Sequence, residues 1–260
     1  MKNNYGWDIN VDDSNNYIDM CSKILSDNEI FKNFKSSEHY NVILEHVDEN
    51  LGRQYYEHIQ KVGNNIFEDM FENFAENDSI GNPKQFLYGD KKISPTTLRY
   101  IKNVLDLSIL CDGIQINKVV EVGCGYGGLC KTMSVLCDFD EYICVDLPEV
   151  VALQEKYLSQ FSNLKDKVKF VPCNKLKNIS NVDLFISNYA LSELTIEAQL
   201  NYYDKIIKNS KVVYITYNSI TNSKDNYNTI ISKLEADNFT FEKNYSDYGY
   251  HNNAIISAKR

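Results

Sequence analysis

The sequence predicts an α/β fold: a mostly parallel sheet of seven strands with an antiparallel C-terminal strand, preceded by a helical N-terminal extension. Three observations support this prediction. Short apolar runs alternate with helical patterns from about residue 94, which indicates parallel strands joined by helices. A glycine-rich turn joins the first apolar run to a helix. The last two apolar runs lie too close together for a helical crossover, so we expect an antiparallel pair.

Composition disfavours several classes of protein. The 260 residues are enough for one domain with an extension, and the net charge of -9 with no run of Lys or Arg disfavours a nucleic-acid partner. None of the 7 cysteines forms a C-x-x-C pair, which disfavours a zinc ribbon or a thioredoxin-like site. The N-terminus lacks the apolar run of a signal peptide, and no segment approaches the ~20 apolar residues of a membrane span. We therefore expect a soluble, cytoplasmic protein that does not bind membranes.

Residues 1–92 are predicted to form the helical extension, acting as a lid or a homodimer surface, and residues 93–260 the α/β domain. One amphipathic helix is predicted by five apolar residues at helical spacing, Tyr40, Ile43, Leu44, Val47 and Leu51. The helical spacing continues over residues 59–74, although Gly63 disfavours a single unbroken helix there. The segment Gly81-Asn82-Pro83 ends the helical pattern.

The elements of the α/β domain follow in order. Ser94 is a helix cap and Pro95 suits the first helical position, so a helix is expected to begin there. Strands are predicted at 118–122, 142–146, 168–171, 183–187, 212–216, 239–244 and 254–258. The intervening helices are predicted from about 127, over 148–158, over about 195–207 and over about 223–236.

The glycine turn is the sharpest feature of the sequence. Gly123, Gly125 and Gly128 fit the pattern G-x-G-x-x-G between a buried strand and a helix, which is typical of nucleotide-binding, Rossmann-like folds. Glu121 precedes the turn by two residues. A carboxylate there suits the ammonium group of S-adenosylmethionine, whereas it would repel a pyrophosphate. The turn therefore favours S-adenosylmethionine over NAD as the cofactor.

Residues at the ends of the next strands complete the predicted cofactor site. Asp146 ends the second strand, where an acidic residue accepts hydrogen bonds from ribose hydroxyls; its alternative role is to cap the helix that follows. Leu147 would pack on the adenosine. Cys173 and Asn174 would meet the adenine edge, and Asn188 leaves the fourth strand at the ligand-binding edge of the sheet. The alternative for these last three residues is an ordinary surface loop.

Several segments resemble the sugar O-methyltransferases, a family with the class I methyltransferase fold. The resemblance rests on Glu-Val-Gly-Cys-Gly-Tyr-Gly-Gly at 121–128 and Val-Asp-Leu-Pro-Glu-Val at 145–150. It extends to 43–47, 81–83, 93–100 and 188–194, and so covers about residues 40–210. Cys124 and Leu194 stand where the family often has Gly and Met, and the chain after about residue 218 matches only loosely. The resemblance implies methyl transfer from S-adenosylmethionine to a hydroxyl of a free, nucleotide-linked or glycan sugar.

A sugar hydroxyl needs a base to remove its proton, and three residues are candidates. His46 comes first because it lies in a segment that resembles the family, and His251 comes second, near the C-terminal strands. Glu193 follows the fourth strand, where it would act as base or orient the sugar; its alternative role is a carboxylate at a helix N-terminus. The alternative role of either histidine is surface or packing.

Three further residues are assigned to the cofactor. Arg99 and Tyr100 would contact the methionine carboxylate or the acceptor, and their alternative role is to pack a helix on the sheet. Tyr126 would cover the methionine portion of the cofactor, and its alternative role is core packing.

Other activities remain open from the sequence. No compact His/Asp motif has the spacing of metal ligands, so we expect a metal-independent enzyme. The rival hypotheses are an NAD(P)-dependent oxidoreductase, a methyltransferase for a non-sugar hydroxyl or amine, and a non-catalytic binding protein with this fold.

Overall fold

The computed structural model of the protein describes residues 11–41, 45–217, 224–242 and 254–260. A seven-stranded sheet lies at the centre, in the order β5-β4-β3-β6-β7-β9-β8. Its strands are β3 (Lys118–Val122), β4 (Glu141–Asp146), β5 (Val168–Pro172), β6 (Val182–Asn188), β7 (Ser210–Tyr217), β8 (Thr240–Phe241) and β9 (Ala254–Lys259). The first five are parallel, whereas β9 runs antiparallel to both β7 and β8. The predicted fold class is confirmed.

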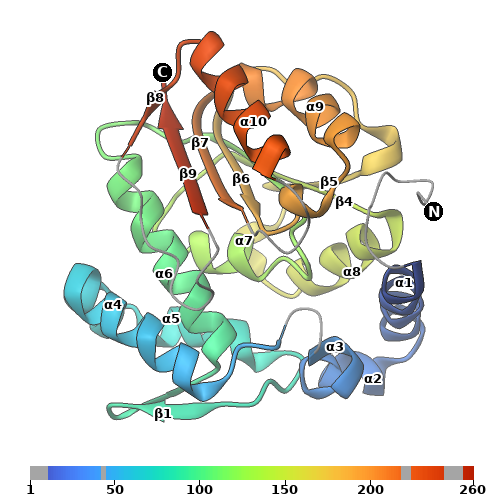
Figure 1. The fold of residues 1–260 in the computed structure, drawn as a ribbon. Helices are drawn as coiled ribbons and strands as arrows, with labels where there is room; N and C mark the ends of the chain where they lie inside the picture. The colour runs from blue at the N-terminus through green and yellow to red at the C-terminus, as the bar shows by residue number, and fades with distance from the viewer. Residues whose placement is uncertain (1–10, 42–44, 218–223, 243–253) are drawn as a thin grey trace.

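Helices cover both faces of the sheet (Figure 1). On one face lie α6 (Pro95–Leu110), α7 (Gly128–Met133) and α8 (Pro148–Leu158), and on the other lie α9 (Ile196–Lys205) and α10 (Lys224–Ala236). Successive strand residues point to opposite faces, so each strand serves two cores: Val119 packs in the first and Val120 in the second.

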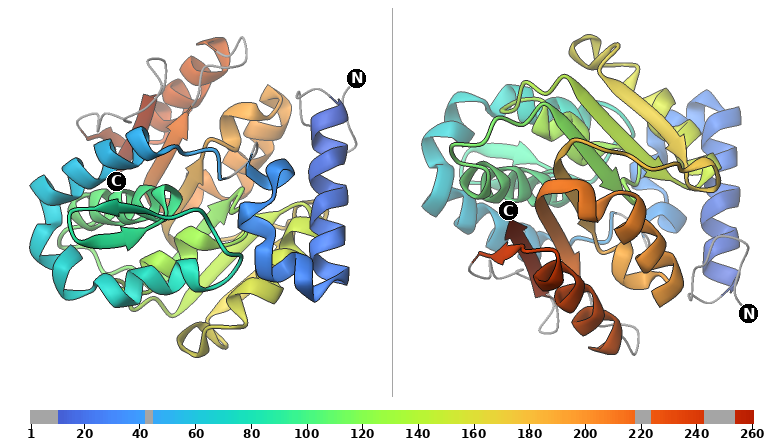
Figure 2. Two further views of the ribbon diagram at one scale, coloured as in Figure 1. Left: turned by 90° about the horizontal axis from the view of Figure 1, so that it is seen from below. Right: turned by 90° about the horizontal axis from the view of Figure 1, so that it is seen from above.

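The N-terminal extension lies along the edge of the sheet where the parallel strands end (Figures 1 and 2). It comprises the helices α1 (Val11–Ser26), α2 (Asn28–Asn33), α3 (Glu38–Asn41), α4 (Glu49–Asp69) and α5 (Phe71–Ala75). Helix α1 packs on α8, and α4 packs on α6. The buried apolar cluster of the first face includes residues from both sides of position 92, such as Tyr40 and Tyr126.

One expectation for the extension is wrong. A single helix was expected through Tyr40 and Leu51, but α3 and α4 are separate and residues 45–48 are not helical; residues 42–44 lie outside the described chain. Asp48 explains the break, because its extended backbone (ψ 175°) and its carboxylate, which accepts a hydrogen bond from Leu51 N at 2.8 Å, start a new helix.

The extension also contains a hairpin that was not predicted from the sequence. Strands β1 (Phe86–Tyr88) and β2 (Lys91–Ile93) pair antiparallel around a two-residue turn at Gly89 and Asp90. Gly89 has φ of 63°, a conformation that glycine adopts without strain. A Gly-Asp pair between two short apolar runs is the signal that predicts such a turn.

Two local predictions are confirmed. The helix α4 is kinked at Gly63, whose φ and ψ of -155° and 31° are not helical. Ser94 caps α6, since its side-chain oxygen accepts a hydrogen bond from Thr97 N at 3.1 Å, and Pro95 takes the first helical position.

A buried ionic cluster joins α4 and α6 to the sheet. Asp106 of α6 is fully buried, and its carboxylate lies 2.8 Å from Lys102 Nζ and 2.9 Å from His58 Nε2. Tyr214 of β7 donates a hydrogen bond to the same carboxylate at 3.5 Å. Because Lys102 is only 1% exposed, Asp106 is what neutralises its charge inside the protein.

In the described chain, no helix is both long and apolar enough to cross a bilayer.

Candidate functional site

The glycine turn lies between β3 and α7 and depends on its glycines. Gly123, Gly125 and Gly127 have positive φ angles of 77°, 55° and 95°. A Cβ atom at Gly123 would overlap the side chain of Ala190, which follows β6. The backbone therefore turns back over the end of β3 in a conformation that a larger residue could not adopt there.

Asp146 ends β4 directly beside this turn. One carboxylate oxygen accepts a hydrogen bond from Leu147 N at 2.9 Å, and the other accepts one from Gln154 Nε2 at 3.0 Å. Gln154 also donates to the carbonyl oxygen of Gly125 at 2.9 Å, so it ties the carboxylate to the glycine turn. The N-cap of α8 is Leu147, and no side chain caps this helix. The alternative role of Asp146 as a helix cap is therefore not what the structure shows.

Residues from distant parts of the chain surround Asp146. Burial and then the charge of Asp146 raise the pKa of the Cys21 thiol in α1 to about 12 and that of the Cys173 thiol to about 11. Cys173 was expected at this site, whereas Cys21 was not. Leu147 is 2% exposed, and Asn174 is exposed in the short turn Cys173–Lys175 that follows β5.

Glu121 is buried beneath the glycine turn. Tyr142 Oη of β4 donates a hydrogen bond to the Glu121 carboxylate at 2.6 Å. Burial raises the pKa of this carboxyl to about 7, despite the hydrogen bond from Tyr142. Contact of Glu121 with an ammonium group stays a prediction.

Tyr126 points from the glycine turn into the extension. It is fully buried, and its ring packs edge-on against Phe34 and Tyr157 at centroid distances of 5.6 and 4.9 Å. Lys35 Nζ lies 4.2 Å from the centroid of the Tyr126 ring and donates to the carbonyl oxygen of Asn77 at 2.5 Å. Burial lowers the pKa of Lys35 to about 8. The contacts of Tyr126 fit the core-packing alternative.

Arg99 and Tyr100 lie on α6 near the end of β6. The Arg99 guanidinium is 5.6 Å from the Tyr100 ring centroid and 5.8 Å from that of Tyr189. Tyr189 directly follows Asn188, whose side-chain oxygen accepts a hydrogen bond from Thr216 at 2.7 Å. The structure thus brings the predicted residues Arg99, Tyr100 and Asn188 to one end of the sheet.

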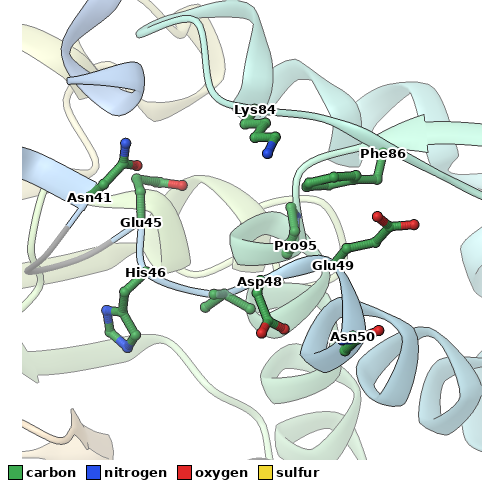
Figure 3. Close-up of a pocket in the computed structure, with 10 residues that line it drawn as sticks. Asn41, Glu45, His46, Asp48, Glu49, Asn50, Lys84, Phe86 and Pro95 are labelled. Atoms are coloured by element: carbon green, nitrogen blue, oxygen red, sulfur yellow. The ribbon is translucent and has the colours of Figure 1, made fainter. Parts of the chain in front are cut away.

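A cavity of about 420 Å³ opens between the extension and the start of α6 (Figure 3). It is lined by Asn41, Glu45, His46, Val47, Asp48, Glu49, Asn50, Lys84, Phe86 and Pro95. His46, the first candidate base, is exposed at this cavity. Its neighbour Glu45 lines the same cavity and was not singled out from the sequence.

The other two candidate bases lie elsewhere. Glu193 is partly buried in the short turn Leu191–Glu193, and α9 is capped by Thr195, so Glu193 is not in the first turn of that helix. His251 lies outside the described residues. Within the described chain, no three His, Cys, Asp or Glu side chains are grouped so as to hold a metal ion.

The buried carboxyl of Asp146 predicts a pH dependence of stability. Burial raises its pKa from 3.8 to about 7, so the folded protein holds a proton that the unfolded chain has released between these values. Stability therefore falls as the pH rises through this range. Between pH 5 and 8, the free energy of unfolding of Asp146→Asn should fall by roughly 2 kcal/mol less than that of the wild type. Urea unfolding without ligand measures this difference. A pH dependence that is unchanged in Asp146→Asn would contradict the raised pKa.

No protein-family model matches the sequence, and a search of curated proteins finds no match. Several solved structures are similar. Magnesium protoporphyrin IX methyltransferase from Synechocystis PCC 6803, with bound SAM, shares 14% identity over 75% of this chain and 96% of that one, with a TM-score of 0.49. TrmK from M. capricolum, in complex with S-adenosyl-homocysteine, shares 11% over 59% and 67%, with a TM-score of 0.43. A SAM-dependent methyltransferase from Aquifex aeolicus shares 14% over 58% and 87%, also with a TM-score of 0.43.

Proposed function

We propose that this protein is an S-adenosylmethionine-dependent methyltransferase whose acceptor is a sugar hydroxyl. The observation that supports it most is the position of the glycine turn beside Asp146. Both lie at the carboxyl ends of adjacent parallel strands, and β3 is where the strand order reverses, with β4 on one side and β6 on the other. Ligands of open α/β sheets bind at this point.

The surroundings of Asp146 fit a nucleoside with polar substituents. Glu149 Oε2 and Gln154 Oε1, on the helix that follows Asp146, are buried and have no hydrogen-bond partner within the described chain. Buried polar atoms are costly unless they are paired, so this concentration favours a ligand with several hydroxyl and amino groups. Asp146 would accept hydrogen bonds from the ribose hydroxyls, and Leu147 would contact the adenosine.

The topology favours S-adenosylmethionine over NAD(P). A dinucleotide-binding sheet is built from two βαβαβ halves, one for each nucleotide. Here the second half starts with β6 and β7 but continues into the antiparallel strand β9. One complete mononucleotide-binding half fits a ligand with a single nucleoside.

In methyl transfer, the protein would chiefly orient and desolvate its two substrates. The cofactor, when bound, supplies an activated methyl group on a sulfonium ion. The extension covers the edge of the sheet and excludes water from it, and a nearby base accepts the proton of the sugar hydroxyl. His46 and Glu193 stay candidates for this base, as does His251.

The sugar assignment rests on the family resemblance and on the cavity beside the extension. Carboxylate and amide side chains dominate the polar lining of the cavity, as in Glu45, Asp48 and Asn50. These groups accept hydrogen bonds from the many hydroxyls of a sugar.

Thermal unfolding with S-adenosylhomocysteine, with NADH and without ligand tests the cofactor. At a hundred times its dissociation constant, S-adenosylhomocysteine is expected to add ~2.7 kcal/mol and to raise the midpoint by roughly 5–10 °C. Asp146→Ala should abolish this shift, whereas Asp112→Ala, exposed at the opposite edge of the sheet, should retain it. A shift with NADH alone would support the oxidoreductase instead, and no shift with either ligand would favour a non-catalytic protein.

A further inference from the structure

Among the residues that line the cavity, Glu45 alone has a buried side-chain oxygen without a hydrogen-bond partner in the described chain. This atom is Oε1. The buried hydroxyl of Thr96, in the first turn of α6, faces Glu45 and lowers the pKa of its carboxyl. In Figure 3, Glu45 and His46 extend in different directions from the backbone, and Glu45 points towards the side of Lys84 and Pro95.

Charged groups surround Glu45 on several elements. The cations are Lys35, in the turn Phe34–Ser36, and Arg99 of α6, and Asp78 of the turn Glu76–Ser79 is the nearby anion. Burial raises the pKa of the Glu45 carboxyl, and the two cations only partly oppose this effect. A carboxylate with a raised pKa is a stronger base than an exposed one.

Glu45 also links the cavity to the predicted cofactor site. Its charge raises the pKa of three buried tyrosines, Tyr40, Tyr100 and Tyr126. Tyr126 belongs to the glycine turn, and its ring centroid lies 6.5 Å from that of Tyr40 and 6.1 Å from that of Tyr100. Glu45 therefore lies both at the cavity and close to the aromatic side chains that pack on the glycine turn.

The charge of the cavity restricts its ligand. Glu45, Asp48 and Glu49 contribute three carboxylates to the lining, whereas Lys84 is its one lysine. The Lys84 amino group lies over the ring of Phe86, 4.9 Å from its centroid. Carboxylates repel phosphate groups, and they accept hydrogen bonds from hydroxyl and ammonium groups.

On the basis of the proposed function, we infer that this cavity binds the acceptor as a sugar without phosphate groups, and that Glu45 is the base for its hydroxyl. The acceptor oxygen forms a bond to the methyl carbon while the carbon–sulfur bond breaks. The electron pair of that bond stays on sulfur, giving the neutral thioether, and the hydroxyl proton passes to the Glu45 carboxylate.

The first experiment measures methyl transfer to methyl glycosides, hexosamines, hexose phosphates and nucleotide-linked hexoses. The phosphate-free sugars are expected to have a kcat/KM at least about 10-fold higher than that of their phosphorylated counterparts. Calorimetric titration with the same sugars, in the presence of S-adenosylhomocysteine, should show the same order of affinity. A preference of 10-fold or more for phosphorylated or nucleotide-linked sugars would overturn the inferred acceptor class.

The second experiment compares Glu45→Gln with the matched exposed variant Glu57→Gln on the best acceptor sugar. Glu45→Gln should lower kcat by at least about 100-fold, with little change in KM and a retained thermal shift with S-adenosylhomocysteine. Glu57→Gln, a surface residue of α4, should stay within about 2-fold of wild type. If Glu45→Gln fails to fold, Glu45→Asp keeps the charge but withdraws the carboxylate, and should lower kcat at least about 10-fold.

The outcomes separate the two proposals. A kcat that survives Glu45→Gln but collapses in His46→Asn would assign the base to His46 and overturn this inference alone. Stabilisation by S-adenosylhomocysteine with no transfer to any sugar would overturn the sugar acceptor and this inference together. The absence of any response to S-adenosylhomocysteine would instead overturn the proposed cofactor.

Discussion

Asp106→Ala is expected to destabilise the protein by about 3–5 kcal/mol, which lowers the unfolding midpoint by roughly 6–20 °C. The carboxylate of Asp106 is fully buried and holds Lys102 at 2.8 Å and His58 at 2.9 Å. Its removal leaves the ammonium group of Lys102, which is 1% exposed, without its counter-charge inside the protein. Unfolding in guanidinium chloride, followed by circular dichroism, measures the effect.

A second substitution isolates the cause. In Asp106→Ala with Lys102→Met, the uncompensated charge is gone, and we expect the double variant to recover at least about 1 kcal/mol relative to Asp106→Ala. Asp112→Ala, on the exposed turn after α6, is the control and should change stability by less than about 0.5 kcal/mol. A cost below about 1 kcal/mol for Asp106→Ala would show that the cluster does not stabilise the attachment of α4 and α6.

Gly123→Val is expected to abolish the thermal shift with S-adenosylhomocysteine and to destabilise the unligated protein by about 2–5 kcal/mol. Two costs combine, because φ of 77° is unfavourable for a β-branched residue and the new side chain would overlap Ala190. Relief of this overlap moves the turn away from β6 and disturbs the backbone that would face the ligand. The measurement is the unfolding midpoint with and without S-adenosylhomocysteine.

Gly113→Val is the matched control for this prediction. Gly113 also has a positive φ of 74°, but a Cβ atom there would meet no other atom within 4 Å. It should therefore show the backbone cost alone, about 1–2 kcal/mol, and keep its full response to the ligand. An equal loss of the ligand response in both variants would mean that global destabilisation, and not the shape of the glycine turn, is responsible.

The regular elements of the sheet could be predicted from sequence because their signals are local. The strand at 118–122, an apolar run, and the helix at 148–158 were predicted with the boundaries that the structure has. The break before α4 was missed because the apolar residues on either side keep helical spacing across it. The hydrogen bond from Leu51 N to Asp48, which starts α4, competes with that spacing and prevails.

The site was predictable where it follows the strand ends and unpredictable where it depends on the extension. Gly123, Asp146 and Asn188 each follow a strand, and the carboxyl ends of parallel strands meet at one edge. Cys21 and Glu45 reach the same region from segments that are more than 70 residues away from Gly123 in the chain. No pattern in a single sequence encodes such long-range packing, so neither Cys21 nor Glu45 was among the predicted site residues.

The aromatic packing around Tyr126 constrains how a ligand could exchange with solvent. Tyr126 belongs to the glycine turn, yet its neighbours Phe34, Lys35 and Tyr40 belong to the extension, and all four are buried. Swinging the whole extension outwards would expose these aromatic rings to water at once, at a cost of several kcal/mol. Turnover that required such an opening would be slow. Substrate and product would therefore need to exchange through a smaller local motion that leaves the aromatic packing around Tyr126 intact.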